Sequence, residues 1–311
     1  MDEEFIKITT MQIDDLKNLP INDGEIYFDY DLKKLNWFNI GGKTKVFFKA
    51  NSLAELVNFL KIFKQRGKIF VLGAGSNVLI SDDDFNGVVI KLGKNFQNLS
   101  ILNENLIIAG CGISQKKLSE FSKENSLTGI EFMSCIPGSV GGGIRMNSGC
   151  FGNEFKDVLI SVQCIDFDGS VKIINKNDIK FEYRGSNLSK DLIFLSATFE
   201  GKKTEQNKIL QIMEQMKNRK EKAQPTKIKT GGSTFKNPIG QTSKKVWELI
   251  NESVPNSLSF GDATISEKHM NFFVNKKDAS FEDMKKLIYT VKEKVHKKTG
   301  IKINPEIIII E

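Results

Sequence analysis

Hydrophobic residues recur at helical spacing in five stretches of the 311-residue chain. The clearest stretch begins at Ser52-Leu53-Ala54-Glu55, where a serine and a glutamate three positions apart form a capping box. Apolar residues follow every three or four positions, and we expect Gly67 to end this helix. A shorter helix is expected after Ser114. The same reading predicts three later helices, over residues 204–223, 243–252 and 280–298.

Short apolar runs bounded by turn residues predict strands between these helices. An Asp168-Gly169 turn between two such runs indicates a β-hairpin. The predicted strands cover residues 69–72, 88–92, 106–109, 158–167, 171–174, 193–199 and 301–310. Helices and many short strands are thus interleaved along the chain, which predicts a mixed α and β protein.

The composition narrows the class of protein. Hydrophobic residues make up 40% of the chain and charged residues 27%, which is typical of a soluble globular protein and not of a disordered or collagen-like chain. The length predicts two or three domains, and Gln224-Pro225 before a lysine-rich stretch indicates a linker. No run approaches the ~20 apolar residues of a membrane span. The acidic start, Met1-Asp2-Glu3-Glu4, predicts that the protein is not exported.

The net charge of +7 raises the question of an anionic partner. Lysine supplies nearly all of the positive charge, since the only arginines are Arg66, Arg145, Arg184 and Arg219. Specific nucleic-acid binders rely on arginine for bidentate contacts, and the lysines here do not form one stripe. We interpret the charge as a solvated surface with a mild attraction for anionic small molecules. A non-catalytic binder of anions or nucleic acid is an alternative that rests on charge alone.

Cysteine and histidine are too scarce and scattered to predict a metal site. The four cysteines form no Cys-x-x-Cys pair, and the chain has two histidines, His269 and His296. We interpret His269 as a loop or core-edge residue and not as a catalyst. The chemistry must therefore use carboxylates, hydroxyls, lysine, arginine or a bound cofactor.

A first glycine-rich loop, Gly73-Ala74-Gly75-Ser76-Asn77, follows a predicted strand. Glycines let a backbone approach a phosphate closely, and successive N–H groups can hold its oxygens. The loop is not a dinucleotide fingerprint of the Rossmann type, because Val78 occupies the third glycine position and no helix is expected after it. A tight turn between strands is the alternative reading.

A second glycine-rich segment is Ile136-Pro137-Gly138-Ser139-Val140-Gly141-Gly142-Gly143. So many glycines cannot build a packed helix or strand cheaply. They suit a backbone that lies against a large planar or phosphorylated ligand, whereas a flexible surface loop is the alternative. Its apolar neighbours indicate partial burial, and two such loops together favour a large, dinucleotide-like ligand.

Three polar motifs are candidates for chemistry. The guanidinium of Tyr183-Arg184-Gly185-Ser186 can bind a carboxylate or an enolate through two parallel bonds, although it could also form a surface ion pair. The segment Gly231–Pro238 combines a hydroxyl, a cation and an amide that suit phosphate and sugar groups; its alternative is a capped loop before a helix. Glu306 follows Asn304-Pro305 and could be an outward-facing strand residue.

Taken in order, the motifs resemble the UDP-N-acetylenolpyruvoylglucosamine reductase (MurB) family. The residues that carry this resemblance are Gly73–Asn77, Ile136–Gly142, Tyr183–Ser186, Gly232–Pro238, Lys268–Phe272 and Pro305-Glu306. The resemblance implies an α+β fold, in which an FAD-binding fold of the vanillyl-alcohol-oxidase-like type has two α+β subdomains. It places these subdomains at residues 1–92 and 93–212, and a C-terminal α+β substrate domain at 213–311.

The resemblance also implies an activity. NADPH would reduce a noncovalent FAD, and the reduced flavin would pass hydride to UDP-N-acetylglucosamine enolpyruvate, which yields UDP-N-acetylmuramate for peptidoglycan synthesis. We expect a cytoplasmic monomer that contacts neither nucleic acid nor membrane. A different flavin enzyme on the same scaffold, such as an alcohol or sugar oxidase, is the alternative, and the Ser233 and Glu306 motifs weigh against it.

Roles follow from matching the motifs. Arg184 and Glu306 would stabilise the enolate, and Ser233 would donate the proton, although Thr234 beside it leaves open which hydroxyl acts. Substrate contacts are expected from Tyr183, Lys236 and Asn237. The expected cofactor contacts are Gly73, Ala74, Gly75, Ser76, Asn77, Ile136, Pro137, Gly138, Ser139, Gly141 and Gly142.

The chain departs from the family pattern at two positions beside the second glycine-rich segment, Cys135 and Arg145. The stretch between Arg184 and Ser233 is short. It resembles the family subtype that lacks an inserted tyrosine loop, so closure over the substrate must come from elsewhere.

Overall fold

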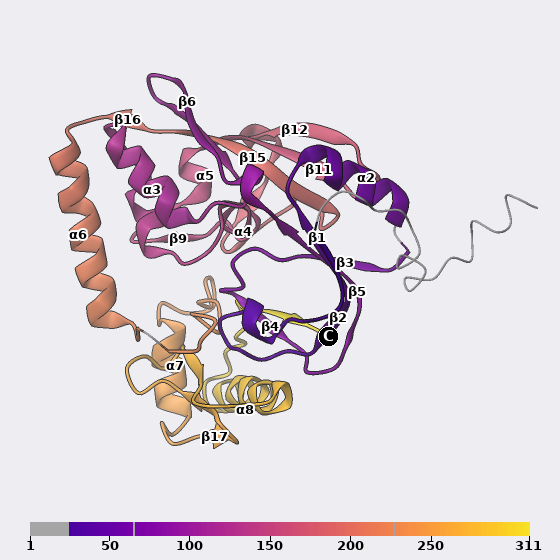
Figure 1. The fold of residues 1–311 in the computed structure, drawn as a ribbon. Helices are drawn as coiled ribbons and strands as arrows, with labels where there is room; N and C mark the ends of the chain where they lie inside the picture. The colour runs from indigo at the N-terminus through magenta and orange to yellow at the C-terminus, as the bar shows by residue number, and fades with distance from the viewer. Residues whose placement is uncertain (1–24, 65, 227) are drawn as a thin grey trace, which may run out of the picture. The chain divides into compact units, whose positions relative to one another are not determined.

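The computed structural model describes residues 25–64, 66–226 and 228–311, which fold into two compact units (Figure 1). The first unit contains residues 44–73 and 85–209 and the described residues before Asp31. The second contains residues 31–43, 74–84 and 210–311. The three predicted domains stay a prediction, and the acidic Met1–Glu4 lies outside the described residues.

A four-stranded sheet in the first unit has the strand order β1-β2-β5-β3. Its strands are β1 (Glu25–Asp31), β2 (Lys43–Ala50), β5 (Phe85–Leu92) and β3 (Lys68–Val71). Strands β2, β5 and β3 are parallel. The expected strands near residues 69–72 and 88–92 are confirmed, whereas β1 and β2 were missed. Consecutive side chains of β2 are buried, so the alternation that marks a half-exposed strand is absent there.

Helix α2 (Leu53–Phe63) begins after the predicted cap residue Ser52, although Glu55 bonds the residue before the cap and so does not complete a capping box. The Ser52 hydroxyl accepts from the Glu55 N–H (3.1 Å), and the Glu55 carboxylate accepts from the Asn51 N–H (2.7 Å). The helix ends before Gly67, because Lys64 adopts a left-handed conformation (φ 46°) and closes the last turn. Its buried face includes Phe59 and Phe63 and packs into a core shared with both sheets of this unit.

The second sheet of this unit has five strands in the order β12-β11-β15-β7-β6. They are β12 (Val171–Asn175), β11 (Leu159–Asp166), β15 (Leu192–Glu200), β7 (Leu106–Gly110) and β6 (Leu99–Asn103). All of its pairings are antiparallel, and the β11–β12 pairing confirms the predicted hairpin. In Figure 1 these strands lie between α2 and α3 (Gln115–Glu124).

The second glycine-rich segment forms a short helix, α4 (Val140–Arg145), which corrects the expectation that its glycines would prevent one. Ser139 caps the helix by accepting from the Gly142 N–H (3.2 Å). A Cβ at Gly143 would lie 2.3 Å from the Phe155 ring, so glycine is what allows this close packing. Tertiary contact therefore offsets the low helix propensity of these residues.

Smaller elements complete the first unit. Helix α5 (Phe155–Val158) brings Phe155 against Phe199 of β15. The two-residue strand pairs are β8 (Leu127–Thr128) with β16 (Lys202–Lys203), β9 (Gly149–Cys150) with β10 (Asn153–Glu154), and β13 (Phe181–Glu182) with β14 (Gly185–Ser186). Among the described residues, 3-10 turns lie at Lys94–Phe96, Glu131–Cys135 and Lys176–Asp178 in this unit and at Lys33–Leu35 in the second unit.

Arg145, one of the departures from the family pattern, connects the end of α4 by hydrogen bonds to the start of β15 and to the residues just before it. Its guanidinium donates to the carbonyls of Leu188 (3.0 Å), Ser189 (2.6 Å) and Leu192 (2.7 Å). It also covers the Phe194 ring at 4.3 Å. Burial lowers the pKa of Arg145 to about 10.

We expect Arg145→Lys to lower the free energy of unfolding by about 2 kcal/mol, because an ammonium cannot reproduce three bonds from one planar fork. Urea unfolding measures this change. Arg219→Lys, at an exposed position of α6 (Gln206–Ala223), is the matched control and should shift it by less than about 0.5 kcal/mol. Equal effects of the two substitutions would contradict the structural role of Arg145.

The second unit is built around α7 (Val246–Ser253) and α8 (Phe281–Thr299). Its three-stranded antiparallel sheet contains β17 (Ser259–Phe260), β18 (Ala263–Ile265) and β19 (Phe273–Asn275). Both helices were predicted, and Gly300 adopts the left-handed conformation (φ 73°) expected after α8. Helix α7 begins three residues later than predicted, since its first N–H, at Val246, is bonded to the Asn237 side chain (3.0 Å).

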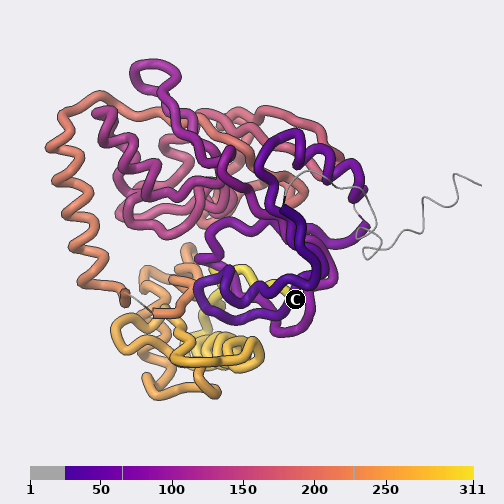
Figure 2. Tube along the Cα trace, viewed as in Figure 1, coloured from indigo at the N-terminus to yellow at the C-terminus, as the bar shows by residue number. Residues whose placement is uncertain are grey.

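The strand predicted over residues 301–310 is wrong in extent, since only β20 (Ile308–Ile310) is a strand. It pairs in parallel with β4 (Val78–Ile80). Figure 2 shows this C-terminal strand, in yellow, beside the early segment of the chain that it pairs with. Before β20, Pro305 forms an isolated β-bridge with Phe235. Proline has no N–H to donate, so the strand does not extend through this position.

Two early segments complete the core of the second unit. Phe38, Ile40 and Leu79 are buried together with the apolar faces of α7 and α8. The Asn275 side chain donates to the Phe38 carbonyl (2.8 Å), and the Asp82 carboxylate accepts from the first N–H of α8 at Phe281 (2.6 Å). The loop from Ala74 to Asn77 therefore belongs to the same unit as the C-terminal residues.

None of the helices among the described residues combines the length and the apolar character that crossing a membrane requires.

Candidate active site

The two glycine-rich segments meet at Gly73 and Ser139 within the first unit. A Cβ at Gly73 would lie 2.4 Å from the Ser139 hydroxyl oxygen, so a side chain there would displace Ser139. The ammonium of Lys91, on β5, donates to the Gly73 carbonyl (2.7 Å). Burial lowers the pKa of Lys91. Lys91 was missed by the sequence analysis, because a lysine near the end of an apolar strand gives no signal of its contact with a distant loop.

The first loop continues in the second unit with a turn that requires glycine. Gly75 has a left-handed φ of 68°, and a Cβ there would lie 2.1 Å from the Leu35 carbonyl oxygen. Its own carbonyl accepts from the Trp37 N–H (2.9 Å). Glycine at Gly73 and Gly75 is therefore what allows the loop to pack closely against Ser139 and Leu35. Loops of this kind can turn successive backbone N–H groups toward a phosphate.

Asn77 ties this loop to Glu306. The Asn77 side chain donates to the Glu306 carbonyl (3.1 Å), and the Asn77 carbonyl accepts from the Ile308 N–H (2.9 Å). The Glu306 N–H in turn donates to the Thr234 carbonyl (2.8 Å). These bonds bring the end of the first glycine-rich loop, Glu306 and the Ser233 segment to one place in the second unit.

Ser233 and Thr234 differ in their accessibility. Ser233 is half-buried and bridges to Phe272, whereas Thr234 has no exposed surface. Among the described residues, the Thr234 hydroxyl is buried and has no hydrogen-bond partner. Asn271 holds the backbone on either side, since its carbonyl accepts from the Thr234 N–H (2.8 Å) and its side chain pairs with both polar groups of the Phe235 backbone. Only Ser233 of this pair can present a hydroxyl to a substrate.

Asn237 has a structural contact that the sequence did not indicate. Its side-chain oxygen accepts from the Val246 N–H, so it fixes the start of α7. Lys236 is half-buried, and its N–H donates to the Asn304 carbonyl (2.9 Å). Both residues therefore lie on the strip of chain that carries Ser233 and that runs beside Pro305.

Arg184 lies in the tight turn between β13 and β14 and has a left-handed φ of 58°. Its guanidinium donates to the Gly149 carbonyl (2.8 Å), lies 3.5 Å from a Glu154 carboxylate oxygen and covers the Tyr183 ring at 4.8 Å. The Arg184 side chain is 17% exposed. Arg184 thus adopts a backbone conformation that is unusual for a non-glycine residue. Its guanidinium is a fixed cation at a partly exposed surface.

His269 packs beside the Ser233 segment, against Phe272. Its ring contacts Phe272 (4.8 Å between centroids), and its Nδ1 accepts from the Asn271 N–H (3.2 Å). Burial lowers the pKa of His269 below 6.5. The interpretation as a core-edge residue agrees with these contacts.

The lowered pKa of His269 predicts a pH dependence of stability. Below pH 6.5, His269 binds a proton more readily in the unfolded chain than in the folded chain. The free energy of unfolding therefore decreases as the pH falls from 6.5 toward the pKa of His269 in the folded protein. We expect His269→Gln to reduce the drop in melting temperature between neutral and mildly acidic buffer. Thermal unfolding across this range measures it, and an unchanged drop would contradict the assignment.

The predicted site residues thus fall into two groups, each within one unit. Gly73, Ser139 and Arg184 belong to the first unit, and Asn77, Ser233 and Glu306 belong to the second. Within the described ranges, no three histidine, cysteine, aspartate or glutamate residues are grouped so that they could hold a metal ion.

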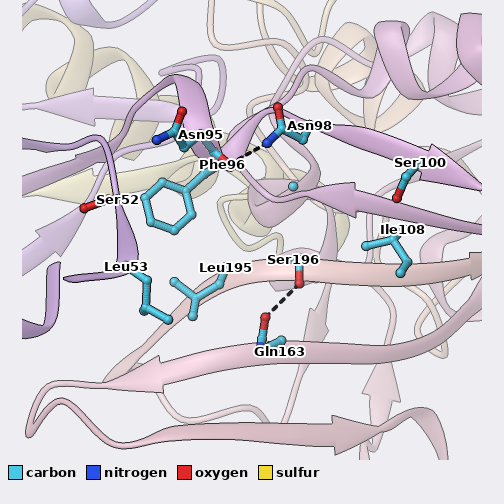
Figure 3. Close-up of a pocket in the computed structure, with 11 residues that line it drawn as sticks. Ser52, Leu53, Asn95, Phe96, Asn98, Ser100, Ile108, Gln163, Leu195 and Ser196 are labelled. Carbon is cyan, nitrogen blue, oxygen red and sulfur yellow. Dashed lines mark hydrogen bonds between the residues drawn. The ribbon is translucent and has the colours of Figure 1, made fainter. Parts of the chain in front are cut away.

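A separate cavity of about 390 Å³ lies in the first unit, between the start of α2 and the antiparallel sheet (Figure 3). Its polar lining includes Ser52, Asn95, Gln163 and Ser196, and the last two are hydrogen-bonded to each other (3.1 Å). None of the predicted site residues lines this cavity.

Comparison with known proteins separates the chain into two matched regions. Residues 44–175 match the family described as FAD binding domain. Residues 224–310 match the C-terminal domain of UDP-N-acetylenolpyruvoylglucosamine reductase. The fold is therefore that of a mixed α and β flavoprotein with an FAD-binding domain and a distinct C-terminal domain.

Full-length relatives define the family more narrowly. The chain is 59% identical to UDP-N-acetylenolpyruvoylglucosamine reductase of Pelagibacter ubique over 92% of this chain and 95% of the relative. It is 42% identical to the enzyme of that name from Rickettsia bellii, over 93% and 95% of the two chains. The crystal structure of UDP-N-acetylenolpyruvylglucosamine reductase (MurB) from Thermus caldophilus aligns with a TM-score of 0.79, at 28% identity, over 93% of this chain and 99% of that one. The chain belongs to the UDP-N-acetylenolpyruvoylglucosamine reductase family.

Proposed function

We propose that this protein is an FAD-containing oxidoreductase that reduces UDP-N-acetylglucosamine enolpyruvate to UDP-N-acetylmuramate, with NADPH as the hydride donor. The observation that carries the proposal is the juxtaposition of Asn77, Glu306 and the Ser233 segment in the second unit. Hydrogen bonds to the backbone thereby join the glycine-rich loop to the segments that carry the Glu306 carboxylate and the Ser233 hydroxyl. Family membership agrees with this activity.

The two glycine-rich segments would hold FAD, which when bound supplies the hydride. Glycine at Gly73 and Gly75 lets the loop pack against Ser139 and Leu35, and the backbone N–H groups of the loop would bind the pyrophosphate. Ser139 lies beside Gly73 and is held by its own bond to Gly142. The other proposed contacts are Ala74, Ser76, Asn77, Ile136, Pro137, Gly138, Gly141 and Gly142.

Arg184 and Glu306 would stabilise the negative charge that develops beside the substrate carboxylate. Arg184 is a permanent cation whose position is fixed by three contacts before substrate arrives. Charge stabilisation of this kind is most effective when the donor does not have to reorganise during the reaction. Glu306 would share a proton with the substrate, and its backbone is fixed on both sides by Asn77 and Thr234.

Ser233 would deliver the proton that completes the reduction. The complete burial of Thr234 favours Ser233 as the donor, since Thr234 cannot reach a substrate. Lys236 and Asn237 on the same strip would contact the pyrophosphate of the UDP group, and Tyr183, which lies beneath the Arg184 guanidinium, would contact the substrate.

The cellular role follows from this reaction. The product is a precursor of peptidoglycan, so the enzyme would act in cell-wall synthesis and hence in cell shape and division. The proposal also places it in the cytoplasm and takes it to be a monomer. No nucleic acid or membrane partner is part of this proposal.

The experiment that tests the proposal identifies the product. Holoenzyme is incubated with NADPH and UDP-N-acetylglucosamine enolpyruvate, and the sugar nucleotide is analysed by mass spectrometry and NMR. We expect UDP-N-acetylmuramate, with two added hydrogen atoms, in amounts equal to the NADPH consumed. Consumption of oxygen with a free sugar and no reduction of the enolpyruvate would overturn the proposal in favour of an oxidase.

A further inference from the structure

Glu154 contacts the cation that the proposed mechanism requires, although nothing in its sequence motif marks it. It is the last residue of β10 and caps the start of α5. One carboxylate oxygen, Oε1, lies 3.5 Å from Nη1 of Arg184. The Glu154 side chain is 19% exposed, so this ion pair is only partly screened by solvent.

The carboxylate of Glu154 is itself held in place. Its other oxygen, Oε2, accepts from the Lys156 ammonium (2.8 Å) and from the Asn147 side chain (3.0 Å). The bond to Glu154 raises the pKa of Lys156. The Glu154 N–H donates to the Asp157 carboxylate (2.8 Å), which fixes the backbone. The side chain and the backbone of Glu154 are therefore both held in place by groups of the protein itself.

Asn147 connects Glu154 to both neighbouring segments. It is fully buried with a left-handed φ of 42°. Its side-chain nitrogen also donates to the Glu182 carbonyl (3.0 Å), and its oxygen accepts from the Lys156 N–H (3.0 Å). Asn147 thus joins the residues after α4, the Glu154 carboxylate and the strand that leads to Arg184.

Glu154 and Gly149 provide two of the contacts that hold the plane of the Arg184 guanidinium. Nη1 faces Glu154, and Nη2 donates to the Gly149 carbonyl on the paired strand β9. A guanidinium has five N–H donors in a rigid fork, so it can keep both contacts and bind a carboxylate as well. Loss of one contact would let the fork rotate, and a misplacement of about 1 Å in a reacting group can cost about a hundredfold in rate.

We propose that Glu154 is a positioning residue, which acts on catalysis by orienting Arg184 toward the carboxylate of the substrate. This inference rests on the proposed function, in which Arg184 stabilises the enolate. It assigns Glu154 to the second half-reaction, because the proposed function gives Arg184 a role only in the reduction of the enolpyruvyl group.

The test measures the two half-reactions of holoenzyme separately by stopped-flow absorbance. We expect Glu154→Gln to slow reoxidation by the enolpyruvyl substrate by about 10- to 100-fold, and to leave reduction by NADPH within about twofold of the wild type. Glu154→Asp keeps the charge and should recover part of the loss. Glu182→Gln removes an exposed carboxylate from the strand that leads to Arg184 and is the matched control, with both rates unchanged.

A double-mutant cycle distinguishes positioning from a general structural role. If Glu154 acts through Arg184, Glu154→Gln should have less than about a twofold effect on reoxidation in an Arg184→Ala background. An equal effect in both backgrounds, or equal slowing of both half-reactions, would overturn the inference. The inference would also be overturned if Arg184→Ala slowed reoxidation and Glu154→Gln did not. If Arg184→Ala itself leaves reoxidation unchanged, the proposed role of Arg184 fails, and the inference about Glu154 fails with it.

Discussion

Ser233→Ala should leave a flavin that NADPH still reduces but that the enolpyruvyl substrate reoxidises about a thousandfold more slowly, which lies within the range expected for loss of a general acid. The separation arises because Ser233 would act only on the carbon that receives a proton, after hydride has left the flavin. Stopped-flow absorbance resolves the two rates. Normal reoxidation in this variant would show that another group donates the proton.

Thr234→Val is the matched control for Ser233→Ala. Thr234 is adjacent in sequence, is fully buried and has a hydroxyl without a hydrogen-bond partner among the described residues. Its replacement by an isosteric apolar side chain should change both half-reactions by less than about threefold and should leave stability equal or higher. A large loss of reoxidation in Thr234→Val alone would reverse the assignment of the donor.

Gly75→Ala should abolish flavin binding and lower the free energy of unfolding by about 3 kcal/mol or more. The added Cβ would lie 2.1 Å from the Leu35 carbonyl oxygen, and the residue would have to keep a φ of 68°. Relief of this clash requires the loop or residues 35–37 to move, and the bond from Trp37 to Gly75 would be lost. Flavin content after purification and urea unfolding measure the two effects.

Gly240→Ala separates the clash from the unfavourable φ. Gly240 has a φ of 85°, but a Cβ there would meet nothing within 4 Å. Gly240→Ala should therefore lower the free energy of unfolding by about 1–2 kcal/mol, from the backbone conformation alone, and should leave the flavin content unchanged. If Gly75→Ala retained its flavin and behaved like Gly240→Ala, the close approach at the first glycine-rich loop would not be part of the cofactor site.

Local signals in the sequence account for the longer helices and for about a third of the strands among the described residues. The side chains of Ser52 and Ser280 accept from N–H groups in the first turns of their helices. A serine before an apolar stretch of helical spacing therefore indicates where that helix begins. The β11–β12 hairpin was likewise visible from its Asp168-Gly169 turn. These features depend on interactions between residues close in the chain.

The missed features depend on residues distant in the chain. Strand β2 has no alternation because neighbours cover consecutive side chains, and the helix α4 exists because Gly143 packs against Phe155. The grouping of residues 31–43 and 74–84 with the C-terminal residues results from the shared core and from the pairing of β4 with β20.

The candidate site shows the same division. The motifs that carry Ser233, Glu306 and Arg184 were identified from their residue types and order. The partners that hold them, among them Lys91, Asn271 and Glu154, were not, because each contributes one ordinary side chain to a contact across the fold.

The most direct test of the central claim is an anaerobic absorbance experiment on the wild-type protein. Purified protein should show the visible absorbance of noncovalent FAD. NADPH should remove that absorbance, and UDP-N-acetylglucosamine enolpyruvate added next should restore it while UDP-N-acetylmuramate forms. A colourless protein that cannot be reconstituted with FAD, or a reduced flavin that the enolpyruvyl substrate leaves unchanged, would contradict the account.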